Sequence, residues 1–218
     1  MNLGVLFSGG KDSTYATYLA QQQHTISCLL SIKPKPESEM FHTPNINITS
    51  LLAQKMNIPH IDMHVQHDEL QTLYELIQQA KNRYNIQGII TGAVGSVYQA
   101  TRIQKICNDL HLWCFNPLWL KPEITLLNEL LEHNFTVIIT GIAAYPLQQE
   151  WLGKTLNAQL INELEQLQQQ YHIHPAGEGG EFETLVINCP LYRQPLVIQQ
   201  ANIQYNNYAG TYHITQAQ

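Results

Sequence analysis

Short apolar runs alternate with stretches of helical periodicity through the first half of the chain. Apolar runs predict strands at residues 3–7, 26–32, 58–65 and 88–91. Apolar residues spaced three or four apart predict helices at residues 11–22, 47–56, 68–84 and 96–110. Because alternating strands and helices are typical of a parallel sheet with helices on both faces, we predict a Rossmann-like α/β domain.

The pattern changes after Trp113–Leu120, an aromatic stretch interrupted by proline that we expect to be a strand entering a loop. Further helices are predicted at residues 123–133 and 156–170, and strands at residues 135–139, 182–187, 195–203 and 208–214. The last three strands follow one another closely across Pro, Asn and Gly turns, which is typical of antiparallel pairing. We therefore predict an α/β domain over residues 1–120 and a smaller α+β domain over residues 121–218.

The segment Ser8-Gly-Gly-Lys-Asp-Ser13 lies between the first predicted strand and the first predicted helix. A helix N-terminus offers backbone N–H groups and a positive dipole to an anion, and Gly9 and Gly10 let the backbone approach closely. The hydroxyls of Ser8 and Ser13 can donate hydrogen bonds, Lys11 supplies positive charge and Asp12 is a candidate Mg²⁺ ligand. We predict a loop that binds the phosphates of ATP; the simpler alternative is a Gly-Gly turn before an ordinary helix start.

Composition and charge narrow the possible partners of the chain. Its 218 residues contain no apolar run long enough to cross a bilayer, and its first residues do not resemble a secretory signal, so we expect a cytoplasmic protein. A net charge of −6 with 11 Lys and Arg residues disfavours nucleic acid as a partner. The four cysteines form no CxxC pair, which argues against zinc binding and thiolation. A homo-oligomer stays open.

A second segment, Gly177-Glu-Gly-Gly-Glu-Phe-Glu-Thr184, places three carboxylates around two glycines. In a strand, Glu181 and Glu183 would project from the same face. A cleft lined by these carboxylates would favour cations, whereas a Gly-Gly hairpin with solvated acidic flanks would need no function.

Histidines cluster at two places in the sequence. His60 and His64 are expected on one face of a strand and His67 before the helix at Asp68, an arrangement that does not favour a metal site. We expect His172 and His174 to be partly exposed strand residues near the second acidic segment.

Several motifs together identify a family. Ser8–Ser13 resembles the PP-loop of the ATP pyrophosphatase superfamily. The remaining matching motifs are Met40–Asn45, Thr91–Ala93 with Ser96 and Tyr98–Arg102, Pro117–Trp119, Trp151–Gly153 and, most specifically, Gly177–Thr184. They resemble the diphthine–ammonia ligase family over residues 3–191. The resemblance implies that ATP and ammonium amidate the diphthine carboxylate of elongation factor 2 through an acyl-adenylate, giving AMP and pyrophosphate.

The resemblance also implies roles for individual residues. Lys11, Asp12 and Glu181 would be catalytic. Residue chemistry makes Asp12 the candidate Mg²⁺ ligand, and the clustering of carboxylates makes Glu181 the candidate that accepts a proton from ammonium. Beyond the loop, the residues implied at the adenosine are Ile32, His42, Gly92 and Ala93. Those implied at the substrate are Tyr98, Gln99, Arg102, Trp119, Trp151, Glu178, Gly179, Gly180, Glu183 and Thr184.

Within the implied substrate site, Tyr98, Trp119 and Trp151 offer aromatic faces to the trimethylammonium group of diphthine, and Arg102 could bind a phosphate or carboxylate. On this view the domain at residues 1–120 binds ATP and that at 121–218 binds the substrate. Two alternatives stay open: a PP-loop enzyme that amidates or thiolates another substrate, and a non-catalytic adenine-nucleotide-binding module.

Overall fold

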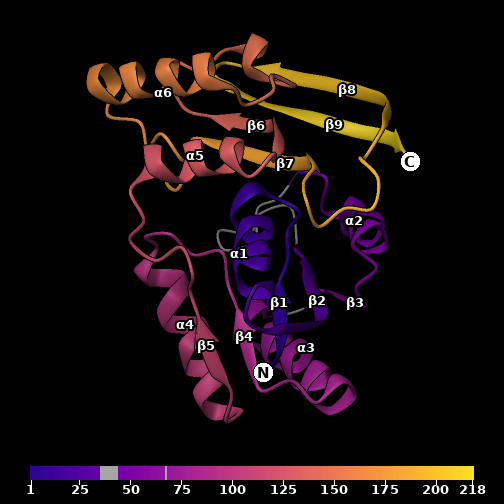
Figure 1. Cartoon of the computed structure of the whole chain (residues 1–218). Coiled ribbons are helices and arrows are strands. Elements are labelled where there is room, and N and C mark those ends of the chain that lie inside the picture. Colours follow the sequence, from indigo (N-terminus) through magenta and orange to yellow (C-terminus); the bar gives the residue numbers. More distant parts are fainter. Residues whose placement is uncertain (35–43, 67) are drawn as a thin grey trace. The chain divides into compact units, whose positions relative to one another are not determined.

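A computed structural model describes residues 1–34, 44–66 and 68–218 (Figure 1). Contacts along the chain divide it into two compact units, Met1–Trp119 and Leu120–Gln218. Among the described residues, no helix combines the length and apolar character that crossing a membrane requires.

The first unit is built on a parallel sheet of five strands in the order β3-β2-β1-β4-β5. The strands are β1 (Asn2–Leu6), β2 (Thr25–Lys33), β3 (His60–His64), β4 (Gly88–Ile90) and β5 (Trp113–Phe115). The helices are α1 (Lys11–Gln21), η1 (Ile46–Ile48), α2 (Thr49–Met56), α3 (Glu69–Tyr84) and α4 (Val97–Asp109). The predicted Rossmann-like parallel sheet is thereby confirmed.

Helices cover both faces of this sheet because its connections run in two directions. Helices α3 and α4 pack on one face, in a buried cluster that includes Leu30 and Ile32 of β2 with Leu76 of α3 and Ile106 of α4. Right-handed crossovers that run in the opposite direction place α1 and α2 on the other face. The local sequence fixes where helices begin: the Asp68 carboxylate accepts the Gln71 N–H at 2.7 Å and so caps α3.

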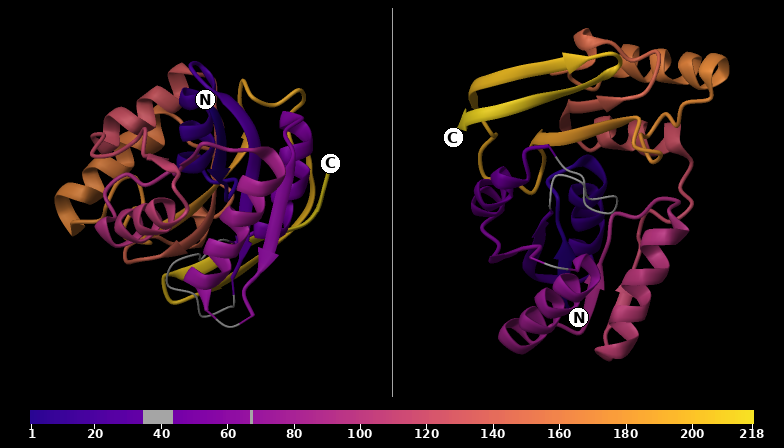
Figure 2. Two further views of the ribbon diagram at one scale, coloured as in Figure 1. Left: turned by 90° about the horizontal axis from the view of Figure 1, so that it is seen from below. Right: turned by 180° about the vertical axis from the view of Figure 1, so that it is seen from behind.

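The second unit combines two helices with an antiparallel sheet in the order β7-β6-β9-β8, as predicted. Its elements are α5 (Glu123–Glu132), β6 (Thr136–Ala143), η2 (Gln149–Trp151), α6 (Ala158–Tyr171), β7 (Phe182–Asn188), β8 (Ile198–Asn206) and β9 (Ala209–Ala217). Strands β8 and β9 form a long hairpin, visible in the right view of Figure 2. Asn207 and Tyr208 close it with positive φ angles of 45° and 63°, the conformation that matches strand twist in two-residue turns.

Two local predictions in the second unit are wrong. Strand β6 continues to Ala143 rather than ending at Ile139, because the Gly141 region pairs with both β7 and β9. His172 and His174 do not lie on a strand. Helix α6 persists through Tyr171 and ends at His172, which has the left-handed conformation with φ 57° rather than an extended one.

Candidate functional site

The segment Ser8–Ser13 lies at the point where the sheet reverses its winding. The chain leaves β1 toward β2 on one side, whereas it leaves β4 toward β5 on the other side. In open α/β sheets, ligands bind beyond the carboxyl ends of the strands at such a switch point. The loops that follow β1 and β4 are therefore the first place to look for a site.

Hydrogen bonds between its own residues hold the phosphate loop in shape. The Ser13 Oγ accepts the Ser8 N–H at 3.2 Å and lies 3.1 Å from the Ser8 Oγ, which in turn accepts the Gly10 N–H at 3.3 Å. Gly9 has a φ of +80°, a conformation that favours glycine. Helix α1 then begins after Gly10, which has no side chain to cover the helix terminus.

Lys11 and Asp12 form an ion pair in the first turn of α1. The Lys11 Nζ donates to Asp12 Oδ2 at 2.8 Å, and Lys11 is only 3% exposed. The hydroxyls of Thr14 and Thr17 bind the carbonyl oxygens of Gly10 at 2.8 Å and Ser13 at 2.6 Å, which anchors this turn. A buried ammonium group is thus held at a helix N-terminus, where the helix dipole already favours an anion.

Gly92, after β4, packs directly against the start of α1. A Cβ atom at this position would lie 2.6 Å from the Ser13 backbone nitrogen and 2.8 Å from the Asp12 carbonyl carbon. Hydrogen bonds also fix the turn at residues 91–93. Thr91 Oγ1 donates to Asn116 Oδ1 at 2.6 Å and accepts the Ala93 N–H at 3.1 Å. Loops from three strands, β1, β4 and β5, therefore meet at the switch point.

The end of β2 contributes a polar network that sequence reasoning missed. The Ser31 hydroxyl donates to the Phe7 carbonyl oxygen at 2.7 Å and lies 2.8 Å from His60 Nε2. Burial, as the largest cause, lowers the pKa of His60 below its usual 6.5; Asp62 opposes this shift and Lys33 adds to it. The signal was available in the strand periodicity, because Ser31 is a polar residue at the end of a buried apolar strand.

Of the residues expected around adenosine, Ile32 is buried in the core cluster shared with α3 and α4. His42 lies outside the described residues. Gly92 and Ala93 lie beside the phosphate loop, as described above.

The acidic segment is organised by His174, which precedes it. The backbone N–H of His174 donates to Glu181 Oε1 at 2.8 Å. In the His174 ring, Nδ1 accepts the backbone N–H of Glu178 at 3.4 Å, and Nε2 lies 3.2 Å from Glu123 Oε1. Accepting at Nδ1 favours the tautomer with the proton on Nε2, which can donate to Glu123. One histidine thereby connects the loop to the first turn of α5.

The predicted strand at residues 182–187 is confirmed, so the condition for a shared face of Glu181 and Glu183 is not met. Strand β7 begins at Phe182, so Glu183 lies within it while Glu181 belongs to the preceding turn. The turn requires glycine, since Gly177 and Gly180 have φ angles of +71° and +84°. Within the described residues, Glu181 Oε2 is buried without a hydrogen-bond partner, so this carboxylate oxygen could accept a donor from a ligand.

Comparison with known proteins identifies the family. The diphthamide synthase N-terminal domain matches residues 1–113, and the diphthamide synthase C-terminal domain matches residues 122–218. The chain belongs to the diphthamide synthase family.

Curated relatives that align with most of the chain are named diphthine–ammonia ligase. That of Homo sapiens is 30% identical and that of Danio rerio 31% identical; the alignments cover 93% and 88% of this chain and 85% and 84% of the relatives. The relative from Schizosaccharomyces pombe is 30% identical over 91% of this chain but only 36% of its own length. These matches confirm the family recognised from sequence motifs and identify the chain as a ligase.

In this member of the diphthamide synthase family, three aromatic side chains were predicted to bind the substrate. Two of them already contact a positively charged side chain of the same protein. The Arg102 guanidinium carbon lies 3.3 Å from the Tyr98 ring centroid, and its Nη1 donates to the Tyr98 carbonyl oxygen at 3.2 Å. The Trp151 ring is largely buried and has Lys154 Nζ 4.8 Å from its centroid. Trp119 is 36% exposed. On the ring faces that Arg102 and Lys154 cover, a trimethylammonium group would have to displace these side chains.

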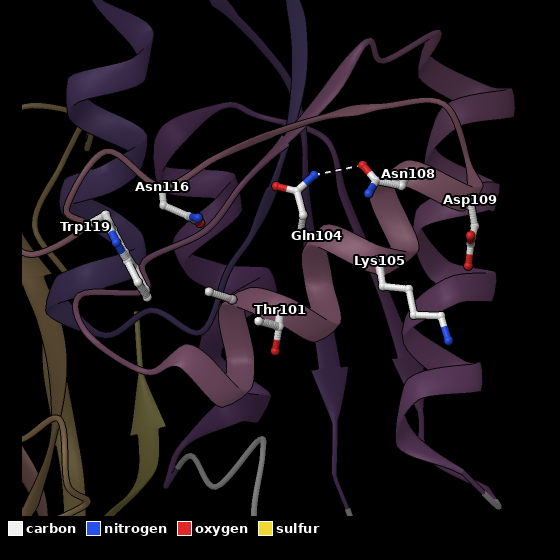
Figure 3. A pocket seen from close by; sticks show the side chains of 8 residues that line it. Thr101, Gln104, Lys105, Asn108, Asp109, Asn116 and Trp119 are labelled. Atoms are coloured by element: carbon white, nitrogen blue, oxygen red, sulfur yellow. Dashed lines mark hydrogen bonds between the residues drawn. The ribbon is translucent and has the colours of Figure 1, made fainter.

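A groove runs along the outer side of α4, with a volume of about 570 Å³ (Figure 3). Its lining residues are Ala100, Thr101, Gln104, Lys105, Asn108, Asp109, Asn116 and Trp119. Only Trp119 among them was predicted from the sequence. The others lie on a helix face whose polar composition is also typical of ordinary solvent exposure, so no pattern distinguished them.

In the part of the chain that the structure describes, no three His, Cys, Asp or Glu side chains gather as ligands for a metal ion. The site of this family member therefore offers Asp12 as a single carboxylate beside the phosphate loop rather than a preassembled metal cage.

Proposed function

We propose that this chain is an ATP-dependent diphthine–ammonia ligase that cleaves ATP between the α- and β-phosphates. The observation that carries the proposal is the packing of Gly92 against Ser13, which brings the loop after β4 onto the phosphate loop beside buried Lys11. Family membership supplies the reaction class. We expect the enzyme to act in the cytoplasm on diphthine-bearing elongation factor 2.

The residues present suit the pyrophosphate portion of ATP. The Gly9 turn, the open N-terminus of α1 and the Lys11 ammonium group provide donors and positive charge for phosphate oxygens. Asp12 would hold Mg²⁺ together with the phosphates, which usually supply most ligands of this ion. When bound, Mg²⁺ would neutralise negative charge that builds up on the leaving pyrophosphate.

The reaction would proceed in two steps. An oxygen of the diphthine carboxylate attacks the α-phosphorus, the bond to the β-phosphate breaks, and pyrophosphate leaves while Lys11 stabilises its charge. Ammonia then attacks the carbonyl carbon of the acyl-adenylate, and AMP leaves. One proton must be removed from ammonium to give ammonia, and a second is lost as the amide forms.

Glu181 is our candidate for the group that accepts the ammonium proton. Its Oε1 is fixed by the His174 N–H at 2.8 Å, while its Oε2 is the buried oxygen described above. A fixed carboxylate near a cationic substrate can both bind ammonium and take its proton. In the same proposal, Glu178, Glu183 and Thr184 line the substrate site, and Arg102 and Gln99 act with Tyr98 on α4.

The proposal is tested with purified chain, ATP, Mg²⁺, ammonium and diphthine-bearing elongation factor 2. We expect AMP to form in equal amount to the amide, detected as the mass change of the modified residue. ADP as product would contradict cleavage at the α-phosphate, and AMP without amide would contradict the substrate. ATP binding without any turnover would favour the non-catalytic module. Glu181→Gln should slow amide formation by about 10²-fold or more, as expected for loss of a general base, while still forming adenylate.

A further inference from the structure

Apart from Trp119, the residues that line the groove along α4 have no role in the reaction described so far. We propose that it seats an extended stretch of the protein substrate's main chain, on one side of the modified residue. This inference rests on the proposed function, since it concerns how the same enzyme would hold a polypeptide substrate.

The lining of the groove suits a peptide backbone. Gln104 Nε2 donates to Asn108 Oδ1 at 2.9 Å, drawn as the dashed line in Figure 3. Because each side-chain amide carries both donor and acceptor atoms, Gln104 still presents a carbonyl oxygen and Asn108 an amide nitrogen. Peptide N–H and C=O groups need one acceptor and one donor of this kind.

The charges and the length of the groove fit a short, uncharged ligand segment. Lys105 and Asp109 carry opposite charges at one end, so the lining as a whole selects neither acidic nor basic peptides. From Ala100 to Asp109 the helix rises about 13 Å, at about 1.5 Å per residue. An extended chain covers this distance with about four residues, at about 3.3 Å each.

One end of the groove is connected to the switch point of the sheet. Asn116 lines the groove beside Trp119, and its Oδ1 accepts the Thr91 hydroxyl at 2.6 Å. Thr91 in turn accepts the N–H of Ala93, next to Gly92 on the phosphate loop. Hydrogen bonds thereby link the Asn116 end of the groove to the loop that packs on the phosphate loop. This continuity favours the substrate as occupant over a second copy of this chain.

The first experiment compares steady-state kinetics of Gln104→Ala/Asn108→Ala with the wild type. Loss of about two backbone hydrogen bonds should raise KM for diphthine-bearing elongation factor 2 about tenfold, with KM for ATP and ammonium unchanged. The matched control is Gln78→Ala/Gln79→Ala on the exposed side of α3. An unchanged KM for the protein substrate, or an equal change in the control, would overturn the proposal.

A second experiment does not depend on turnover. Thr101, an exposed residue of the groove, is replaced by the photo-cross-linker p-benzoylphenylalanine and irradiated with purified diphthine-bearing elongation factor 2. We expect cross-links to residues next to the diphthine in the factor's sequence. Cross-links to distant parts of the factor, or only to a second copy of this chain, would refute the groove assignment. Absence of amide formation by the wild type would instead refute the proposed function, so the two failures are distinguishable.

Discussion

Residues 8–13 and residues 177–184 each combine a Gly-Gly pair with charged side chains, yet the structure holds them in different ways. The first segment is fixed by backbone packing, with Gly92 against Ser13 and Lys11 buried in the helix start. The second is a turn whose glycines at 179 and 180 are exposed, and His174 holds it through hydrogen bonds.

The difference indicates which changes each segment should tolerate. Backbone atoms cannot move aside for an added methyl group, whereas the end of a flexible carboxylate can. We therefore expect substitutions that crowd the backbone of the phosphate loop to affect folding and ATP binding together. Substitutions in the acidic turn should separate stability from catalysis.

The largest expected effect comes from Lys11→Met. This change removes the buried ammonium group but keeps much of the side-chain volume, so the fold should persist. Loss of charge stabilisation on the leaving pyrophosphate should lower the rate of AMP formation by about 10²- to 10³-fold. The rate of AMP formation is measured in a single turnover. Lys55→Met on α2 provides the control and should retain near wild-type rates. If Lys11→Met were equally active, Lys11 would not stabilise the leaving pyrophosphate.

The next effect concerns the packing that defines the first segment. Gly92→Ala would place its methyl group 2.6 Å from the Ser13 nitrogen, and we expect a loss of about 1–3 kcal/mol in unfolding free energy. ATP binding should weaken as α1 is displaced. Gly95→Ala is the matched control, because a Cβ there meets no atom within 4 Å. Denaturant unfolding and ATP titration of both variants test this prediction. Equal stability of the two variants would mean that α1 can move away from residue 92 at little cost in free energy.

The sequence predicted the first segment more completely than the second. The β1–loop–α1 unit depends on local signals, namely an apolar strand, a Gly-Gly turn and a helix start, so its position and form could be predicted. The contact of Gly92 with Ser13 joins residues far apart in the sequence, and no periodicity reveals it. In the acidic turn, the Gly-Gly pair indicated a bend, but the position of Glu181 depends on its bond to His174. That hydrogen bond joins residues on the two sides of the turn, and no periodicity in the sequence reveals it.

Substitutions at the exposed glycines Gly179 and Gly180 should have smaller effects, one on kcat and the other on stability. In Gly179→Ala a Cβ would lie 2.7 Å from Glu181 Oε1, so the carboxylate should move and the amidation kcat should fall about tenfold, with little loss of stability. Gly180→Ala has open space around the new atom but keeps a φ of +84°, so it should cost about 1 kcal/mol of stability and spare kcat. Thermal unfolding and kcat measured on both variants test this division. The same pattern in both would mean that Glu181 does not depend on its contact with residue 179.

The smallest expected effect is a pH dependence of Tm, which should come from His60 in the first unit and not from His213 in the second. Because burial lowers the pKa of His60 below 6.5, the unfolded chain binds a proton near pH 6.5 that the folded chain does not yet accept. The contribution of neutral His60 to stability is therefore complete above pH 6.5 and is lost as the pH falls from 6.5 through the lowered pKa. We expect Tm to fall between about pH 7.5 and pH 5.5, and His60→Gln, whose amide can still reach Ser31, to reduce that fall. His213→Gln on the exposed side of β9 is the control. If His60→Gln and the wild type lose the same Tm over this interval, the network at the end of β2 does not set the pH response of the first unit.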